Sequence, residues 1–204
     1  MKVEVVSYDP KWRDAFVEEA KEITAVLDDP IAAIHHIGST AIPNIYAKPI
    51  IDVLVEVNDL AQVDDRNAAM ETLGYEAMGE FGIAGRRFFR KHNAMGVRTH
   101  HVHIFEQGSP ERDRHLAFRD YMIAHPDAAQ QYSQLKRSLA AKYPEDRESY
   151  MDGKDSSFSM GSTVRLNGWV VSSTAISNPR YASKRGSKKS LRCGSISSSN
   201  VFCN

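Results

Sequence analysis

One hydrophobic run, Ile50–Val57, constrains the fold of this 204-residue chain more than any other segment. Its sequence, IIDVLVEV, is apolar and mostly β-branched apart from two acids, which is typical of a strand. Residues alternate between the two faces of a strand. Asp52 and Glu56 therefore share one face with Leu54. Because an inward carboxylate in an apolar strand is costly unless it is used, Asp52 is the first candidate functional residue.

A tight turn precedes this strand at residues 36–40, which read His-Ile-Gly-Ser-Thr. Gly38 allows the backbone to approach a phosphate closely, and Ser39 offers a hydroxyl and an N–H at the start of a short helix. The returning strand brings Asp52 beside the turn, where a carboxylate can hold Mg²⁺ against phosphate groups. Lys48 lies just ahead of the strand and can neutralise phosphate charge.

The remaining pattern predicts an alternation of helices and strands. Helical spacing of apolar residues predicts helices over 10–27, 59–73, 110–125 and 127–140. Short apolar or β-prone runs predict strands over 33–37, 86–91 and 100–105, the last two joined as a hairpin. Arg86 and Arg90 alternate with Arg87 and Lys91, so either pair can face a cleft beside Asp52.

The run HIGSTAIPNIYAKPIIDVLVEV, at residues 36–57, closely resembles the GrpB family, which in turn resembles the nucleotidyltransferase superfamily. The superfamily pattern is Gly-Ser, about ten residues, and then Asp-x-Asp/Glu on a strand. The likeness continues through GRRFFRK, THHVHIF and LAFRDYMIAHPDAAQQYSQLKRSLA, and it covers about three quarters of the chain. The resemblance implies an α/β (α+β) domain over residues 1–156, with a nucleotidyltransferase-like mixed β-sheet flanked by helices.

The chain departs from the superfamily pattern at the second carboxylate, because Leu54 stands two residues after Asp52. Glu56 faces the same way but lies about 13 Å further along an extended strand, whereas paired metal ions sit about 4 Å apart. His101 and His103, on a neighbouring strand about 5 Å away, are better placed to join Asp52. Glu56 can join this site only if the strand bends, and with that case included the predicted metal ligands are Asp52, Glu56, His101 and His103. Imidazoles favour Zn²⁺, Ni²⁺ or Mn²⁺ over Mg²⁺.

The resemblance implies a nucleotidyltransferase-like protein that binds a nucleoside triphosphate with a divalent metal, Mg²⁺ or Mn²⁺, with Zn²⁺ as an alternative. Asp52 is the expected catalytic residue, and the acceptor of the nucleotidyl group is unknown. The expected phosphate-binding residues are His36, Gly38, Ser39, Thr40, Lys48 and Arg86.

Two other functions stay open, and whether the protein is an enzyme stays open with them. The first is a non-catalytic nucleotide- or phosphate-binding module, or a partner module, that has lost the second metal carboxylate. Leu54 favours this alternative. The second is a metal-dependent hydrolase built on His36, His101 and His103, which requires the three imidazoles to converge on one metal ion.

The net charge of zero conceals an uneven distribution. Residues 1–160 hold 26 acidic and 19 basic residues, and residues 161–204 hold seven basic and no acidic ones. Nucleic-acid binding is therefore unexpected except through the tail. We expect the Ser-rich tail, residues 157–204, to be disordered or divergent. No signal-peptide core or membrane-length apolar run is evident, and both cysteines lie in the tail, so we expect a cytoplasmic protein.

Overall fold

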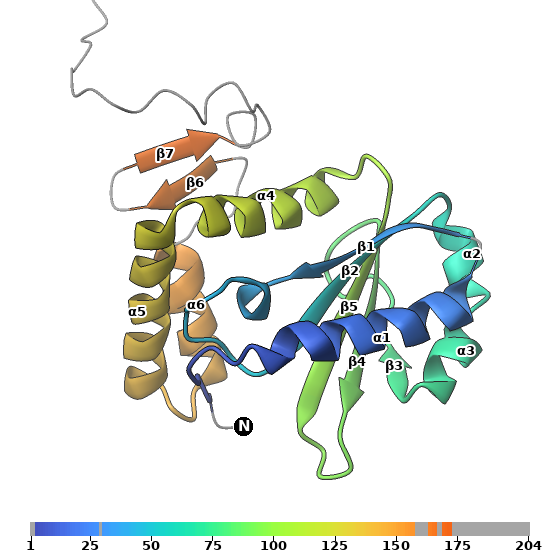
Figure 1. The fold of residues 1–204 in the computed structure, drawn as a ribbon, viewed down its shortest axis with the longest axis horizontal. Coiled ribbons are helices and arrows are strands. Elements are labelled where there is room, and N and C mark those ends of the chain that lie inside the picture. The colour runs from blue at the N-terminus through green and yellow to red at the C-terminus, as the bar shows by residue number, and fades with distance from the viewer. Residues whose placement is uncertain (1–2, 29, 158–162, 167–168, 173–204) are drawn as a thin grey trace, which may run out of the picture.

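The structure is a computed structural model, which describes residues 3–28, 30–157, 163–166 and 169–172 (Figure 1). Five strands form the main sheet, in the order β1-β2-β5-β4-β3. These strands are β1 (Ile31–Ile37), β2 (Ile51–Val57), β3 (Tyr75–Ala77), β4 (Arg86–His92) and β5 (Arg98–Glu106). The helices are α1 (Lys11–Leu27), the 3₁₀ turn η1 (Ser39–Ala41), α2 (Leu60–Asp64), α3 (Asn67–Thr72), α4 (Pro110–Ala124), α5 (Pro126–Lys142) and α6 (Arg147–Ser157).

The sheet is mixed, because β2 runs parallel to β5 while the other neighbouring pairs are antiparallel. β4 and β5 form the hairpin that the sequence predicts. The expected fold class, a mixed sheet flanked by helices, is confirmed.

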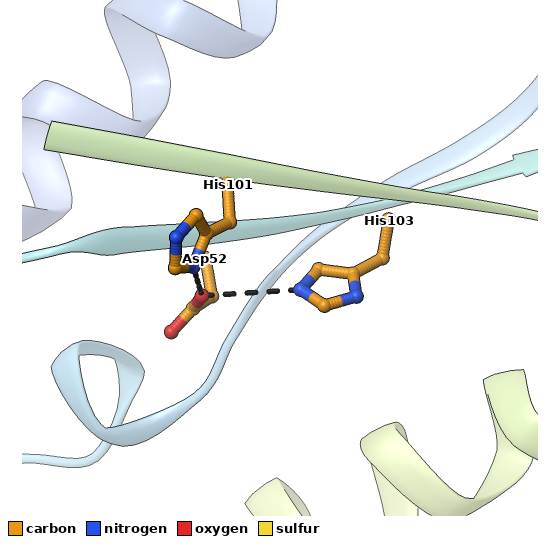
Figure 2. A group of neighbouring side chains, drawn as sticks. All are labelled: Asp52, His101 and His103. Atoms are coloured by element: carbon orange, nitrogen blue, oxygen red, sulfur yellow. Dashed lines mark hydrogen bonds and ion pairs between the residues drawn. The ribbon is translucent and has the colours of Figure 1, made fainter. Parts of the chain in front are cut away.

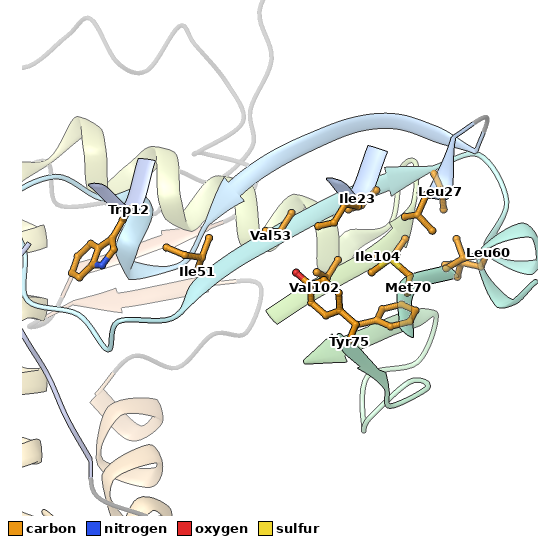
Figure 3. Packing of buried hydrophobic residues seen from close by; sticks show 14 of the residues in the cluster. Trp12, Ile23, Leu27, Ile51, Val53, Leu60, Met70, Tyr75, Val102 and Ile104 are labelled. Carbon is orange, nitrogen blue, oxygen red and sulfur yellow. The ribbon is translucent and has the colours of Figure 1, made fainter. Parts of the chain in front are cut away.

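The main hydrophobic core lies between one face of the sheet and helices α1, α2 and α3 (Figure 3). The strand residues in this core come from alternate positions of β2 and β5, as period-2 alternation requires. Fully buried examples are Val53, Val55, Val57, Val102 and Ile104, which pack with Ile23 and Leu27 of α1. Each such side chain contributes about 1.5–3 kcal/mol by leaving water.

The opposite face of the sheet carries the polar groups and is covered in part by α4. Here Leu54 of β2 packs with Ile37 and Phe105, and Leu116 of α4 lies against them. A third apolar cluster joins the segment after η1 to α4 and α5 through Ile42, Ile45, Met122, Ala129 and Tyr132. α4 therefore covers part of the face on which Asp52 lies.

Residues 59–73 form two short helices, so the prediction of one helix there is wrong. Asp59 caps α2 by accepting a hydrogen bond from the Ala61 N–H at 2.8 Å. The segment then turns at Asp65 and Arg66, where Arg66 has φ −99° and ψ 6°. The run DDRN offers no apolar residue at helical spacing, and the chain re-enters a helix only at α3.

Part of the tail forms a two-stranded antiparallel sheet, β6 (Thr163–Leu166) with β7 (Trp169–Ser172). The other tail residues beyond 157, including both cysteines, lie outside the described residues, so the expectation for the tail stays a prediction. Within the described part of the chain, no helix combines the length and apolar character that crossing a membrane requires.

Candidate functional site

The parallel pairing of β2 with β5 sets Asp52 directly opposite His101 and Leu54 opposite His103. His101 Nδ1 donates a hydrogen bond to Asp52 Oδ1 over 2.9 Å, and His103 Nε2 lies 3.9 Å from the same oxygen (Figure 2). One ligand atom from each of the three side chains lies within 4.8 Å of the others. The structure therefore brings together one carboxylate and two imidazoles of the predicted metal set.

Gly38 lies against the Asp52 carboxylate. Its backbone has φ 70° and ψ −170°, a conformation that is nearly restricted to glycine. A Cβ at this position would collide with Asp52 Oδ2. Gly38 is therefore required both by its own dihedral angles and by the side chain next to it, and Ser39 begins the η1 turn directly afterwards.

Arg86 lies at the other side of the cluster and is only 6% exposed. Its guanidinium donates to the carbonyls of Glu80 at 3.1 Å and Phe81 at 2.7 Å, and Nη1 lies 3.4 Å from His103 Nδ1. The Arg86 side chain therefore lies on the same face of the sheet as Asp52, whereas Arg87 forms an ion pair with Asp64 of α2. This answers the question of orientation that the sequence left open.

Burial and neighbouring charges set the ionisation of the cluster. Burial raises the pKa of Asp52, but hydrogen bonds and attraction to His101 and His103 outweigh it and hold that pKa below its usual range. Burial lowers the pKa of the His103 imidazole against the pull of Asp52. Asp52 is thus ionised and His103 is neutral at pH 7, which are the forms in which these side chains bind metal ions.

His115 of α4 was not predicted as a site residue, yet it adjoins the cluster. Its ring centroid lies 5.2 Å from that of His103. Burial, followed by His103 and Arg114, lowers the pKa of His115 to about 3. A signal was present in the sequence, because His115, Phe118 and Met122 recur at helical spacing and so share one face of α4.

Glu56 does not join Asp52, so its prediction as a metal ligand of the same site is corrected. Its side chain is 5% exposed, and Oε1 accepts hydrogen bonds from Arg112 at 2.7 Å and His35 at 2.6 Å. The strand stays extended between Asp52 and Glu56, so the two carboxylates remain apart. Glu56 instead ties α4 to the first two strands of the sheet.

Three of the predicted phosphate-binding residues, His36, Thr40 and Lys48, contact groups outside the cluster. The His36 ring stacks on Phe16 of α1 at 4.8 Å, and its Nε2 lies 3.0 Å from the Thr40 hydroxyl. That hydroxyl donates to the Ile50 carbonyl at 3.2 Å, and the Lys48 ammonium lies 4.2 Å from the centre of the Tyr150 ring.

Because His36 lies on the opposite face of the sheet, the hydrolase built on His36, His101 and His103 is wrong. Burial lowers the pKa of His36 to about 4, so its imidazole is neutral and serves the packing between α1 and the sheet.

The donor set at Asp52 fits a divalent metal ion. His101 Nδ1 and His103 Nε2 are the imidazole nitrogens that face Asp52 Oδ1, at 2.9 Å and 3.9 Å, so a metal ion shared by the three side chains would replace the hydrogen bond from His101 Nδ1. Two imidazoles and one carboxylate suit Zn²⁺ or Mn²⁺ better than Mg²⁺, which prefers oxygen ligands.

Fold and site together define an α/β protein that carries a carboxylate–imidazole cluster on the polar face of a mixed sheet. The family model described as "GrpB protein" matches residues 2–161, and the chain belongs to this family. The UPF0157 protein YqkA of Bacillus subtilis is 50% identical over 154 residues, which are 76% of this chain and 44% of YqkA. This chain thus spans less than half the length of that relative.

Among solved structures, the conserved protein GrpB from Enterococcus faecalis aligns with a TM-score of 0.70 at 44% identity. The alignment covers 73% of this chain and 90% of the E. faecalis chain. A Cid1 poly(U) polymerase chain aligns with a TM-score of 0.47 at 13% identity, which is too distant to support a statement about this chain.

Proposed function

We propose that the protein binds a divalent metal ion through Asp52, His101 and His103 and holds the phosphates of a nucleoside triphosphate beside it. The observation that carries the proposal is the convergence of these three ligand atoms within 4.8 Å, directly against the Gly38 turn. A Cβ at Gly38 would collide with the Asp52 carboxylate, so the glycine lets the backbone of the turn lie directly against this proposed metal ligand.

In this proposal, different residues bind the metal ion and the phosphates. Asp52 supplies a negative charge, and His101 and His103 supply nitrogen donors. Arg86 supplies a fixed positive charge for phosphate oxygens, because its guanidinium is held by the carbonyls of Glu80 and Phe81. The bound metal would act as a Lewis acid that stabilises charge on the phosphates.

Metal and nucleotide binding can serve either nucleotidyl transfer or binding alone, and the missing second carboxylate bears on the choice between them. In nucleotidyl transfer, an acceptor hydroxyl attacks the α-phosphate in line and pyrophosphate leaves. Leu54, however, is fully buried against Ile37 and Phe105, so a carboxylate at that position would have to displace apolar packing. This specific packing favours the second candidate, a nucleotide-binding module without transferase chemistry.

Calorimetric titration tests the proposal. Mn²⁺, Zn²⁺ and Mg²⁺ are titrated into the protein, and ATP, GTP, CTP and UTP follow with the metal that binds. Asp52→Asn should weaken metal binding at least tenfold and abolish metal-dependent nucleotide binding, because an amide is a poorer ligand than a carboxylate.

The matched control is Asp64→Asn, which removes a surface carboxylate that pairs with Arg87. This variant should bind metal and nucleotide as the wild type does. Absence of metal-dependent nucleotide binding by the wild type would refute the proposal. Binding without pyrophosphate release, over a panel of hydroxyl acceptors, would select the binding module.

A further inference from the structure

The loop between β3 and β4 presents an aromatic ring beside the candidate metal site. Phe81 is 55% exposed, and its ring stacks on Phe88 with the centroids 5.2 Å apart and the planes 19° from parallel. Phe88 in turn packs against His101 at 5.3 Å and His103 at 5.1 Å. A continuous set of rings therefore leads from the proposed metal ligands to the surface.

Phe81 is held in this exposed position at a conformational cost. Its φ is +44°, which is unfavourable for a bulky side chain. Arg86 donates to the Phe81 carbonyl at 2.7 Å, and Gly85 N–H donates to Glu80 Oε1 at 2.7 Å. Arg86, which lies against His103, is therefore also hydrogen-bonded to the loop that carries Phe81.

Exposed apolar side chains are common on protein surfaces, and a single one needs no explanation. In the described part of the chain, the other large apolar side chains that are exposed are Val17, Met95, Val97 and Ile123. None of these has an aromatic ring. Phe81 differs from them in its strained backbone and in its stacking on a ring that contacts both candidate metal ligands.

We propose that Phe81 is the platform on which the base of the bound nucleotide stacks, with its phosphates directed toward Asp52, His101 and His103. This subsite rests on the proposed function, and it would recognise the base of the nucleotide, which a metal–phosphate site alone does not contact. An aromatic face binds any base, because every base has a π-face. The platform therefore favours nucleotides over inorganic polyphosphate and discriminates only weakly among the four bases.

The test compares ATP with inorganic tripolyphosphate, both at saturating Mn²⁺, by calorimetry. Wild-type protein should bind ATP more tightly than tripolyphosphate. Phe81→Leu keeps an apolar side chain but removes the ring, and it should weaken ATP binding about fivefold or more, since stacking contributes roughly 1–3 kcal/mol per base. The same variant should leave Mn²⁺ and tripolyphosphate binding unchanged.

Phe81→Trp is the matched variant that retains a stacking ring. It should keep the wild-type ATP affinity, and ATP should quench the added indole fluorescence while tripolyphosphate does not. Equal binding of ATP and tripolyphosphate by the wild type, or unchanged ATP binding in Phe81→Leu, would overturn the platform and leave the metal–phosphate proposal intact. Absence of both ATP and Mn²⁺ binding by the wild type would overturn the platform and the metal–phosphate proposal together.

Discussion

Gly38→Ala tests whether the turn and Asp52 act as one unit. The dihedral angles of Gly38, φ 70° and ψ −170°, cost about 1–3 kcal/mol for a residue with a Cβ. The new methyl group would also collide with Asp52 Oδ2, while Oδ1 of that carboxylate accepts a hydrogen bond from His101. The turn or the carboxylate must therefore move, which adds to the strain.

We expect Gly38→Ala to lower the free energy of unfolding by about 3 kcal/mol, measured by urea denaturation. Mn²⁺ affinity, measured by calorimetry on the folded variant, should fall at least tenfold, which corresponds to about 1.4 kcal/mol. The reason is that a displaced carboxylate no longer converges with His101 and His103.

Gly108→Ala is the control, because Gly108 has a similar φ of 76° but no heavy atom near an added Cβ. This variant should lose about 1 kcal/mol through backbone strain alone and bind Mn²⁺ normally. Equal destabilisation of the two variants, together with unchanged Mn²⁺ affinity in Gly38→Ala, would refute the coupling between the turn and Asp52.

Two further predictions concern residues away from the metal cluster. Arg112→Ala should lower the free energy of unfolding in urea at pH 7 by about 2 kcal/mol, because it leaves buried Glu56 with His35 alone. Glu56→Gln combined with Arg112→Ala should recover part of this loss. No recovery would contradict the view that the unpaired Glu56 charge causes it. The pKa of His36 is lowered to about 4 from 6.5, so its contribution to stability is complete above pH 6.5 and is lost as the pH falls toward 4. His36→Phe should therefore flatten the dependence of unfolding free energy on pH between 6.5 and 4, and a slope equal to that of the wild type would count against burial as the cause.

Local pattern was sufficient to identify the elements on which the site is built. The period-2 alternation of Ile50–Val57 predicted that Asp52 faces away from Val53 and Val55, and the core is arranged in this way. The same alternation placed His101 and His103 on one face of their strand. These predictions succeeded because side-chain direction along a strand depends only on the local backbone.

The sequence alone did not determine which side chains meet across strands. The parallel pairing of β2 with β5 aligns Asp52 with His101, and this register depends on contacts between segments about 50 residues apart. The hairpin register selected Arg86, and not Arg87, for the Asp52 face. His36 was misassigned because its ring faces α1, where it stacks on Phe16 and lies 3.0 Å from the Thr40 hydroxyl.

The sequence by itself indicated the family through the resemblance of residues 36–57, and residue type and local periodicity predicted four of the five strands of the main sheet, the inward carboxylate and the glycine turn, but not β3. Only the tertiary structure decided the membership of the site. It excluded Glu56 and His36, placed His115 beside His103, and brought Phe81, Phe88 and the two histidines of β5 into a continuous series of ring contacts. The physical reason is that these relations follow from strand register and from the packing of α4, which are set by contacts distant in the chain.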